Sequence, residues 1–363
     1  MTIRTDIGKR LAEGRQLLRA AYKQQDAAKL GVLRAGNTGI MSVDGEVAGA
    51  CHRVAHLRQL GIELDPPDDS SLVMFQVGTS NEDIVYRDLV ETAAENEVIL
   101  REEEIPIEWF TANGTKVTGR PDMVICERRE LGKEEGDIGF LYRSNEDISE
   151  QYLYKPLLLL ELKSVASVWT SRSVLGERDP KLSHLAQAAH YMWKLGNIPG
   201  RLIYKQYAIQ EIPGWTETVN GEKRNGWTRR LFPKPGKFGS EYIDYEKGRI
   251  RPFELVYTLR FSEAGVLEFK REHEPETDWT ETVVTTQDIE RFYSYVSTME
   301  AEQKIGPKPL TLGAAGDEKS FSNCSYCPLN AECRKAEKLP VGEQYVAWLT
   351  AARKLVADRE DKK

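Results

Sequence analysis

The chain has 363 residues, of which 40% are hydrophobic and 29% charged, as expected for a globular protein with a sizeable core. Its formal net charge of −7 argues against a generally basic nucleic-acid-binding surface but allows a local basic groove. No apolar run is long enough to cross a membrane, the amino-terminal segment lacks the apolar core of a secretory signal, and the five cysteines are too few for a disulfide scaffold. We therefore expect an intracellular protein with no membrane contact.

The first part of the chain is predicted to be helical. The spacing of apolar residues indicates helices over 6–30 and 51–61, and Gly61 closes the second of them. A third helix is predicted over 79–96, with Thr79 or Ser80 as its cap and acidic residues in its first turn.

Strands and helices alternate in the rest of the chain. Two extended runs, 98–110 and 116–126, flank the turn at Asn113–Gly114 and predict a β-hairpin. The acidic segment 127–151 is interpreted as an insertion, and the run LLLLELKSV at 157–165 indicates a buried strand. Further elements are expected: a helix over 181–195, a strand over 201–209, strands near 253–270, a helix near 286–303, and a last helix with Tyr345, Trp348, Leu349, Ala352 and Leu355 on one face. This order predicts an α/β fold with a mixed sheet flanked by helices.

The strand at 157–165 ends in two charged residues, Glu161 and Lys163. Residues i and i+2 of a strand point to the same face, so these two side chains project side by side. One interpretation is an exposed ion pair where a strand reaches water, which is common and weak. The other is a functional carboxylate and amine at the end of a buried strand.

Asp122, in the segment GRPD, comes just before the apolar run Met123–Ile125. Alone it could be a turn aspartate after Pro121. Together with Glu161 and Lys163, it has a second possible role. Two carboxylates can share a divalent cation, and the amine can orient water and offset phosphate charge. This equipment suits metal-assisted phosphodiester hydrolysis.

The combination RPD…ELK resembles the PD-(D/E)XK nuclease superfamily, and QAAHY resembles the QxxxY element of its RecB-like exonuclease branch. The resemblance implies a restriction-endonuclease-like core in which Asp122, Glu161 and the backbone carbonyl of Leu162 bind Mg²⁺ or Mn²⁺, with Lys163 as the catalytic amine. Gln187 and Tyr191 share one helix face and would position the lysine or a DNA phosphate. Without that context, a Gln and a Tyr at this spacing would simply line a half-buried helix face.

The same family carries an upstream helix with a glycine followed by a histidine or an acid. Here the segment is GTSNED, which contains Gly78 and Glu82, and Asn81 stands near the position at which many RecB-like members have a histidine. The resemblance implies that Glu82 is a metal ligand or an acceptor next to the metal. The alternative is an acid at a helix start, where the helix dipole favours it.

Three cysteines lie close together in NCSYCPLNAEC: Cys324, Cys327 and Cys333. A metal centre usually needs four ligands, and Cys51 is the candidate for the fourth. This split resembles the iron–sulfur RecB-like nucleases, including the AddB nuclease domain and the CRISPR-associated RecB-like exonucleases, and implies a 4Fe–4S cluster that joins the two ends of the chain. Zinc is the alternative. Cys126 is expected to be a buried apolar residue.

Basic residues with interleaved aromatics mark a candidate DNA-binding arm at 222–238. Cations can follow phosphates while aromatics stack on unpaired bases, although a solvated hairpin with aromatic anchors would have the same composition. The candidate DNA-binding residues are Trp227, Arg229 and Arg230 in this arm, and Arg172, Arg178 and Lys181 ahead of the QxxxY helix. His184 and His190 are expected to be packing or polar helix residues rather than metal ligands.

The resemblance covers about residues 48–335, which we expect to be the nuclease domain with insertions near 127–151 and 213–250. A helical region (1–47) precedes it, and a helix with a charged tail (336–363) follows it. The expected activity is metal-dependent DNA exonuclease action on single strands or duplex ends, in recombination, repair or phage DNA processing, in the cytoplasm of a bacterial or phage-infected cell. The chain has no phosphate-binding loop of its own, so a recombination or helicase protein is an expected partner.

Two other functions are compatible with the same sequence. One is an endonuclease of a restriction or CRISPR spacer-acquisition system. The other is a non-catalytic nucleic-acid-binding module on a nuclease scaffold.

Overall fold

The computed structural model describes residues 31–64, 69–101, 104–105, 107–130, 140–142, 152–176, 179–212, 216–219, 222–225, 232–272, 278–310, 312–316 and 327–360. Several predictions fall outside these ranges: the helix over 6–30, the cluster ligand Cys324, and the DNA-binding candidates Arg178, Trp227, Arg229 and Arg230.

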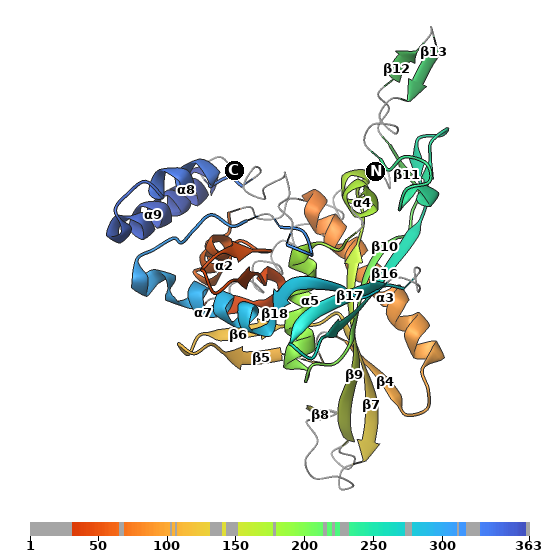
Figure 1. Ribbon diagram of the computed structural model, residues 1–363, viewed down its shortest axis with the longest axis horizontal. Helices are drawn as coiled ribbons and strands as arrows, with labels where there is room; N and C mark the ends of the chain where they lie inside the picture. Colours follow the sequence, from red (N-terminus) through yellow and green to blue (C-terminus); the bar gives the residue numbers. More distant parts are fainter. Residues whose placement is uncertain are drawn as a thin grey trace, which may run out of the picture.

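A large mixed sheet runs through the middle of the molecule (Figure 1). Its order is β18 (Thr280–Thr285), β17 (Val266–Arg271), β16 (Phe253–Phe261), β10 (Gly200–Gln206), β9 (Tyr152–Ser164), β7 (Met123–Glu130) and β4 (Glu97–Arg101), and β8 (Phe140–Tyr142) pairs with β9. Only β9 and β10 are parallel among these pairs. The α/β class with a mixed sheet and helices is thus confirmed.

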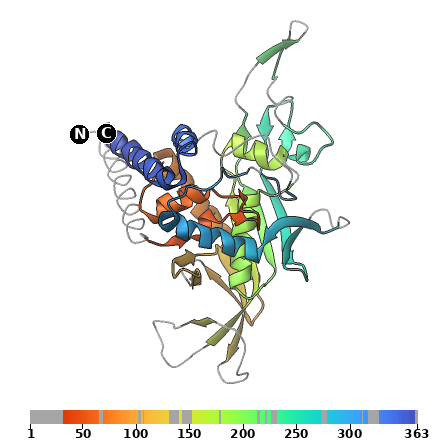
Figure 2. The same ribbon diagram turned by 60° about the vertical axis from the view of Figure 1, so that its left-hand side comes forward.

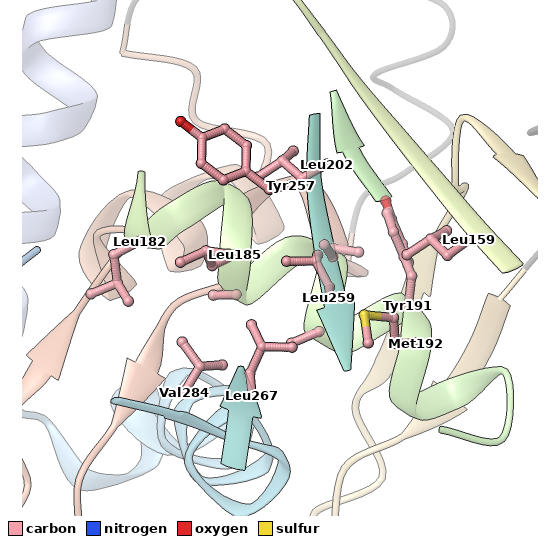
Figure 3. Packing of buried hydrophobic residues seen from close by; sticks show 14 of the residues in the cluster. Leu159, Leu182, Leu185, Tyr191, Met192, Leu202, Tyr257, Leu259, Leu267 and Val284 are labelled. Carbon is pink, nitrogen blue, oxygen red and sulfur yellow. The ribbon is translucent and has the colours of Figure 1, made fainter. Parts of the chain in front are cut away.

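The leucine run of β9 is explained by helices on both faces of the sheet. Leu159 packs with Leu185 and Met192 of α5 (Leu182–Lys194) in the main core, which Figure 3 shows from close by. Leu160 and Leu162 pack on the opposite face in a cluster with residues of α3 (Asp69–Thr92). A strand covered on both faces needs no polar alternation, so a continuous apolar run is the expected pattern.

The expected single hairpin between 98–110 and 116–126 is wrong in part. Each run divides into two strands, and the halves belong to different sheets: β4 pairs with β7 in the large sheet, while β5 (Ile107–Phe110) pairs with β6 (Lys116–Gly119) around the Asn113–Gly114 turn. The strand β1 (Leu33–Arg34) completes the smaller sheet. The chain changes sheet at Arg120–Pro121, where proline has no N–H to continue a ladder.

The predicted start of the third helix is also wrong. Helix α3 begins at Asp69, and Thr79 lies inside it, where its hydroxyl donates to the carbonyl of Phe75 at 3.3 Å. Gly78 and Thr79 imitated a helix start, but a helix interior tolerates both at a small cost. Glu82 therefore does not lie in a first turn, and the helix dipole does not explain it.

A second hydrophobic cluster joins early and late parts of the chain. It contains Leu57 of α2 (His52–Gln59) and Trp348 of α9 (Val341–Glu360), together with residues of α7 (Thr286–Glu302) and α8 (Asn330–Ala336). The predicted face of the last helix is confirmed, since Tyr345, Trp348, Leu349 and Ala352 are buried and Leu355 packs against them. The predicted closure of α2 is confirmed too, because Gly61 adopts a positive φ of 73° directly after it.

Two extensions project from the body in both views (Figures 1 and 2). One is the hairpin β12 (Thr216–Val219) and β13 (Glu222–Asn225), and the other is formed by β7, β8 and the first half of β9. The remaining described elements are α4 (Val168–Gly176), the strands β2 (Ile40–Met41), β3 (Val47–Ala48), β11 (Gln210–Glu211), β14 (Ile243–Asp244) and β15 (Arg249–Ile250), and the 3₁₀ turns η1 (Ala35–Asn37) and η2 (Ser240–Tyr242). None of the helices in the described ranges is long and apolar enough to span a membrane.

Candidate active site

Asp122 and Glu161 meet at neighbouring strand ends of the large sheet. The antiparallel register pairs Met123 with Leu160, so Asp122, one residue earlier, lies opposite Glu161, one residue later. The backbone N–H of Leu162 donates to Oδ2 of Asp122 at 2.7 Å and fixes this carboxylate against β9. Glu161 is fully buried, whereas Asp122 is half-buried.

A chain of hydrogen bonds links the strand to α5. Nζ of Lys163 donates to Oε1 of Glu161 at 2.5 Å and to Oε1 of Gln187 at 3.1 Å. The Gln187 amide in turn donates to the hydroxyl of Tyr191 at 3.4 Å. The five residues singled out from RPD, ELK and QxxxY are thus brought to one place, although they come from three separate segments.

The pKa values in this site are shifted by burial and by the closeness of several carboxylates to one another. Burial raises the pKa of Asp122 well above its usual range, and the charges of Glu161 and Glu82 raise it further, against the opposing effects of Lys163 and the Leu162 N–H. Burial lowers the pKa of Lys163, but the charges of Glu161 and Asp122 more than offset this, so the amine keeps its proton. The arrangement is one that a cation would stabilise.

Helix α3 is tied to the same end of β9 through Asn81. Its side-chain amide donates to Oγ of Ser164 at 3.1 Å, and its carbonyl accepts from the hydroxyl of Tyr207 at 3.3 Å. This anchoring explains why the charge of the next residue, Glu82, acts on both Asp122 and Lys163. Sequence reasoning singled out Glu82 but missed the anchoring role of Asn81.

Gly119, the glycine of GRPD, was also missed. A Cβ atom there would lie 2.5 Å from Cε1 of Tyr191 and 2.8 Å from Cβ of Ala35, both too close. The ring of Tyr191, which is 2% exposed, therefore packs directly against the backbone at Gly119. The signal was present in the sequence, because a glycine beside a motif often marks a close approach.

Two of the DNA-binding candidates lie on elements that follow β9. Arg172 is on α4, and Lys181 is the residue that precedes α5; both are partly exposed. Both elements belong to the connection between the parallel strands β9 and β10, beyond the carboxyl end of β9. Ligands of α/β sheets commonly bind at such strand ends.

The cysteine region lies apart from this site, around α2 and α8. Cys51 directly precedes α2, and it lines one cavity together with Cys327 and Cys333. The buried guanidinium of Arg53 crosses the same region: it donates to the carbonyl of Ile305 at 2.9 Å and pairs with Glu337 at 2.7 Å.

No metal centre is formed within the described part of the chain. Among those residues, no three His, Cys, Asp or Glu side chains are placed to hold one ion, so neither the proposed carboxylate set nor the thiols Cys51, Cys327 and Cys333 forms such a group. Cys126 is buried in the sheet, as expected, and burial raises the pKa of its thiol to about 12.

Comparison of the chain with protein-family models, with curated proteins and with solved structures found no match.

Proposed function

We propose that this protein is a metal-dependent DNA exonuclease that hydrolyses phosphodiester bonds on single strands or duplex ends. The observation that carries the proposal is the meeting of Asp122, Glu161 and Lys163 at adjacent strand ends, with Gln187 hydrogen-bonded to the lysine. Separate segments of one chain seldom bring a buried carboxylate, a half-buried one and an amine together without a chemical use, because burying charge is costly.

The donor atoms suit a divalent cation by their chemical type, although no three of the described acidic side chains are placed around one point. Asp122, Glu161 and Glu82 would supply carboxylate oxygens, the ligands that Mg²⁺ and Mn²⁺ prefer; burial raises the pKa of Asp122, and repulsion from the other two carboxylates raises it further. The Leu162 carbonyl adds a fourth oxygen, because N–H and C=O of one residue in an extended strand face the same side and this N–H faces Asp122. When bound, the ion would supply Lewis-acid stabilisation of the charge that develops on the phosphate.

The other side chains of the site have distinct roles. Lys163 keeps its charge and lies where it can orient a water molecule and offset phosphate charge. Gln187 fixes the position of the amine, and Tyr191 fixes Gln187. Arg172 and Lys181 are candidates to bind phosphates further along the strand.

Cleavage of end-labelled and circular single-stranded DNA, with and without Mg²⁺ or Mn²⁺, tests this proposal. We expect metal-dependent loss of the labelled end and no cutting of circles. Cutting of circles would favour an endonuclease of a restriction or spacer-acquisition system. Binding without cleavage under every metal condition would leave only a nucleic-acid-binding module, and a matched RNA substrate decides which nucleic acid is preferred.

We also infer a 4Fe–4S cluster at Cys51, Cys324, Cys327 and Cys333, with zinc as the alternative metal. The support is the resemblance of the cysteine pattern, together with the shared cavity of three of these thiols. Protein purified without oxygen should be brown and contain about four irons. Serine at any of the four positions should remove the iron, while Cys126→Ser should retain it; a colourless protein with one zinc would keep the ligands and replace the cofactor.

The setting that suits this activity is recombination, repair or phage DNA processing in a bacterial or phage-infected cell. Because the chain has no motor motif, a recombination or helicase protein would supply the free strand. The hairpin β12–β13 projects from the body, and its second strand forms the beginning of the basic segment 222–238, a place from which an arm could reach DNA (Figure 2).

A further inference from the structure

A second polar contact between the sheet and α5 lies beside the one made by Lys163. In the parallel register of β9 and β10, Tyr204 is the partner of Lys163, so both side chains face α5. Lys163 reaches Gln187, and the hydroxyl of Tyr204 reaches Nδ1 of His184 at 2.9 Å. His184, Gln187 and Tyr191 are spaced by three and four residues and share one helix face, so His184 continues the polar row toward the start of α5.

The hydrogen bonds around Tyr204 favour one tautomer of His184. The backbone N–H of Lys181 can only donate, and it donates to the Tyr204 oxygen at 3.1 Å. The phenol therefore has its own proton left to give, and Nδ1 of His184 is placed to accept it. An imidazole that accepts at Nδ1 and is neutral carries its proton on Nε2.

The charge state agrees with this assignment. Burial lowers the pKa of His184 well below its usual value near 6.5, and the nearby positive charges of Lys163 and Lys181 lower it further. The residue is partly exposed, and its Nε2 is not among the buried side-chain atoms that lack a partner in the described part of the chain, so this nitrogen is available to a ligand. His184 thus offers a fixed, uncharged N–H donor in the first turn of α5, where the partial positive charge of a helix favours anions.

We propose that His184 binds the nucleic-acid substrate by donating a hydrogen bond from Nε2 to a non-bridging oxygen of a phosphate group adjacent to the one that is cleaved. Tyr204 is the positioning residue that holds the ring in this tautomer. The inference rests on the proposed nuclease function and names a phosphate contact for the same site. It goes beyond the expectation that His184 is a packing or polar helix residue rather than a metal ligand.

Two substitutions separate substrate binding from a merely structural role. His184→Gln keeps an N–H donor near the position of Nε2, whereas His184→Asn keeps an acceptor near Nδ1 for Tyr204 but loses the outer donor. A binding role predicts that Gln retains function and Asn does not. A structural role, in which His184 only satisfies Tyr204, predicts the opposite order.

The measurement is the affinity for a single-stranded oligonucleotide with Ca²⁺ in place of Mg²⁺, as a function of salt concentration. We expect His184→Asn to bind about tenfold more weakly, the scale of one hydrogen bond to a charged group, with an unchanged salt slope because no cation is lost. Lys181→Ala is the matched control, since losing a cation should reduce the slope by about 0.7 for a single strand. In cleavage with Mg²⁺, His184→Asn should raise KM more than it lowers kcat.

The outcomes distinguish this inference from the proposed function. Equal binding by His184→Asn and wild type, or a salt slope that falls as it does for Lys181→Ala, would overturn the phosphate contact while wild-type cleavage still upheld the nuclease. A wild-type protein that neither binds nor cleaves the oligonucleotide would overturn both. Melting temperatures of the two variants within a few degrees of wild type exclude unfolding as the cause.

Discussion

Two of the places where the described residues bury charge differ in how well that charge is satisfied. In the region of α2, the guanidinium of Arg53 has two backbone carbonyl partners, Ile305 and Gly306, and the carboxylate of Glu337. At the end of β9, burial raises the pKa of Asp122, and the carboxylates of Glu161 and Glu82 raise it further, while the charge of Lys163 and the Leu162 N–H oppose this shift only in part.

The difference separates a structural charge from a functional one. A buried ion whose hydrogen bonds are complete holds segments together, and removing it leaves its partners unsatisfied. A buried acid held among other acids destabilises the fold and persists where a ligand or a reaction uses it. We therefore expect substitutions at Arg53 to reduce stability, and substitutions at Asp122 to reduce activity without reducing stability.

The largest expected effect is on cleavage by Asp122→Asn. The asparagine can still accept the Leu162 N–H but loses the charge that a divalent cation needs, so the rate should fall by about 10²–10³-fold or more. In the absence of metal, the same variant should melt at a higher temperature than wild type. Asp83→Asn, which removes an exposed carboxylate of α3, is the control and should change both quantities little.

The pH dependence of this stability difference follows from the raised pKa of Asp122. Between the ordinary aspartate pKa near 3.8 and the raised value in the fold, the folded protein holds more protons than the unfolded chain, so wild-type stability falls as pH rises through this interval. Asp122→Asn should be free of this loss. Denaturant unfolding at several pH values in EDTA measures the free energies of unfolding of both proteins. An Asp122→Asn variant less stable than wild type at neutral pH would contradict the view that the charged form of Asp122 destabilises the fold.

The site residues that belong to short sequence motifs were predictable from the sequence. The two-residue period of a strand places Glu161 and Lys163 side by side, and the spacing of a helix face does the same for Gln187 and Tyr191, but their assignment to a site also needed the resemblance to a nuclease family. The exchange of strands between two sheets at Arg120–Pro121 was not predictable, because each run of residues has the same local propensity whichever sheet it joins.

The contacts that hold the site together were not predictable either, since they arise from long-range packing. The pairing of Tyr204 with Lys163 depends on the register of two parallel strands, and that register is fixed by the whole connection between them. The start of α3 at Asp69 was not predicted, because Gly78 and Thr79 are residue types that often mark a helix boundary.

The second-largest expected effect is a loss of stability in Arg53→Ala. Loss of this buried guanidinium leaves the Gly306 carbonyl and Glu337 without this partner, and the Ile305 carbonyl with His52 alone, which should cost about 3 kcal/mol of unfolding free energy. Arg53→Lys should recover only part of this, because an amine cannot reproduce the geometry of the guanidinium fork.

Arg58→Ala, at an exposed position of the same helix, is the matched control for Arg53. Denaturant unfolding gives the free energies, and cleavage assayed well below the melting temperature should be close to normal for all three variants. A folded Arg53→Ala protein that had lost cleavage would break the comparison, because it would make the α2 region part of the active site.

The smallest expected effect concerns the glycine beneath Tyr191. A methyl group at Gly119 would meet the Tyr191 ring at 2.5 Å, so Gly119→Ala must displace the ring, and overpacking of this kind costs about 1–3 kcal/mol. The φ of Gly119 is not positive, so the cost is steric rather than a matter of backbone conformation. Since the Tyr191 hydroxyl accepts from Gln187, and Gln187 holds Lys163, displacement of the ring should also lower kcat by a fewfold.

Gly78→Ala provides the matched control for Gly119→Ala. A Cβ at Gly78 has no neighbour within 4 Å and lies in the interior of α3, so alanine there should stabilise the protein by about 0.5–1 kcal/mol. The same exchange of residues should therefore have opposite signs at the two positions. If Gly119→Ala instead kept full stability and full kcat, the Tyr191 ring could move without consequence, and the hydrogen-bond chain from Tyr191 to Lys163 would not position the amine.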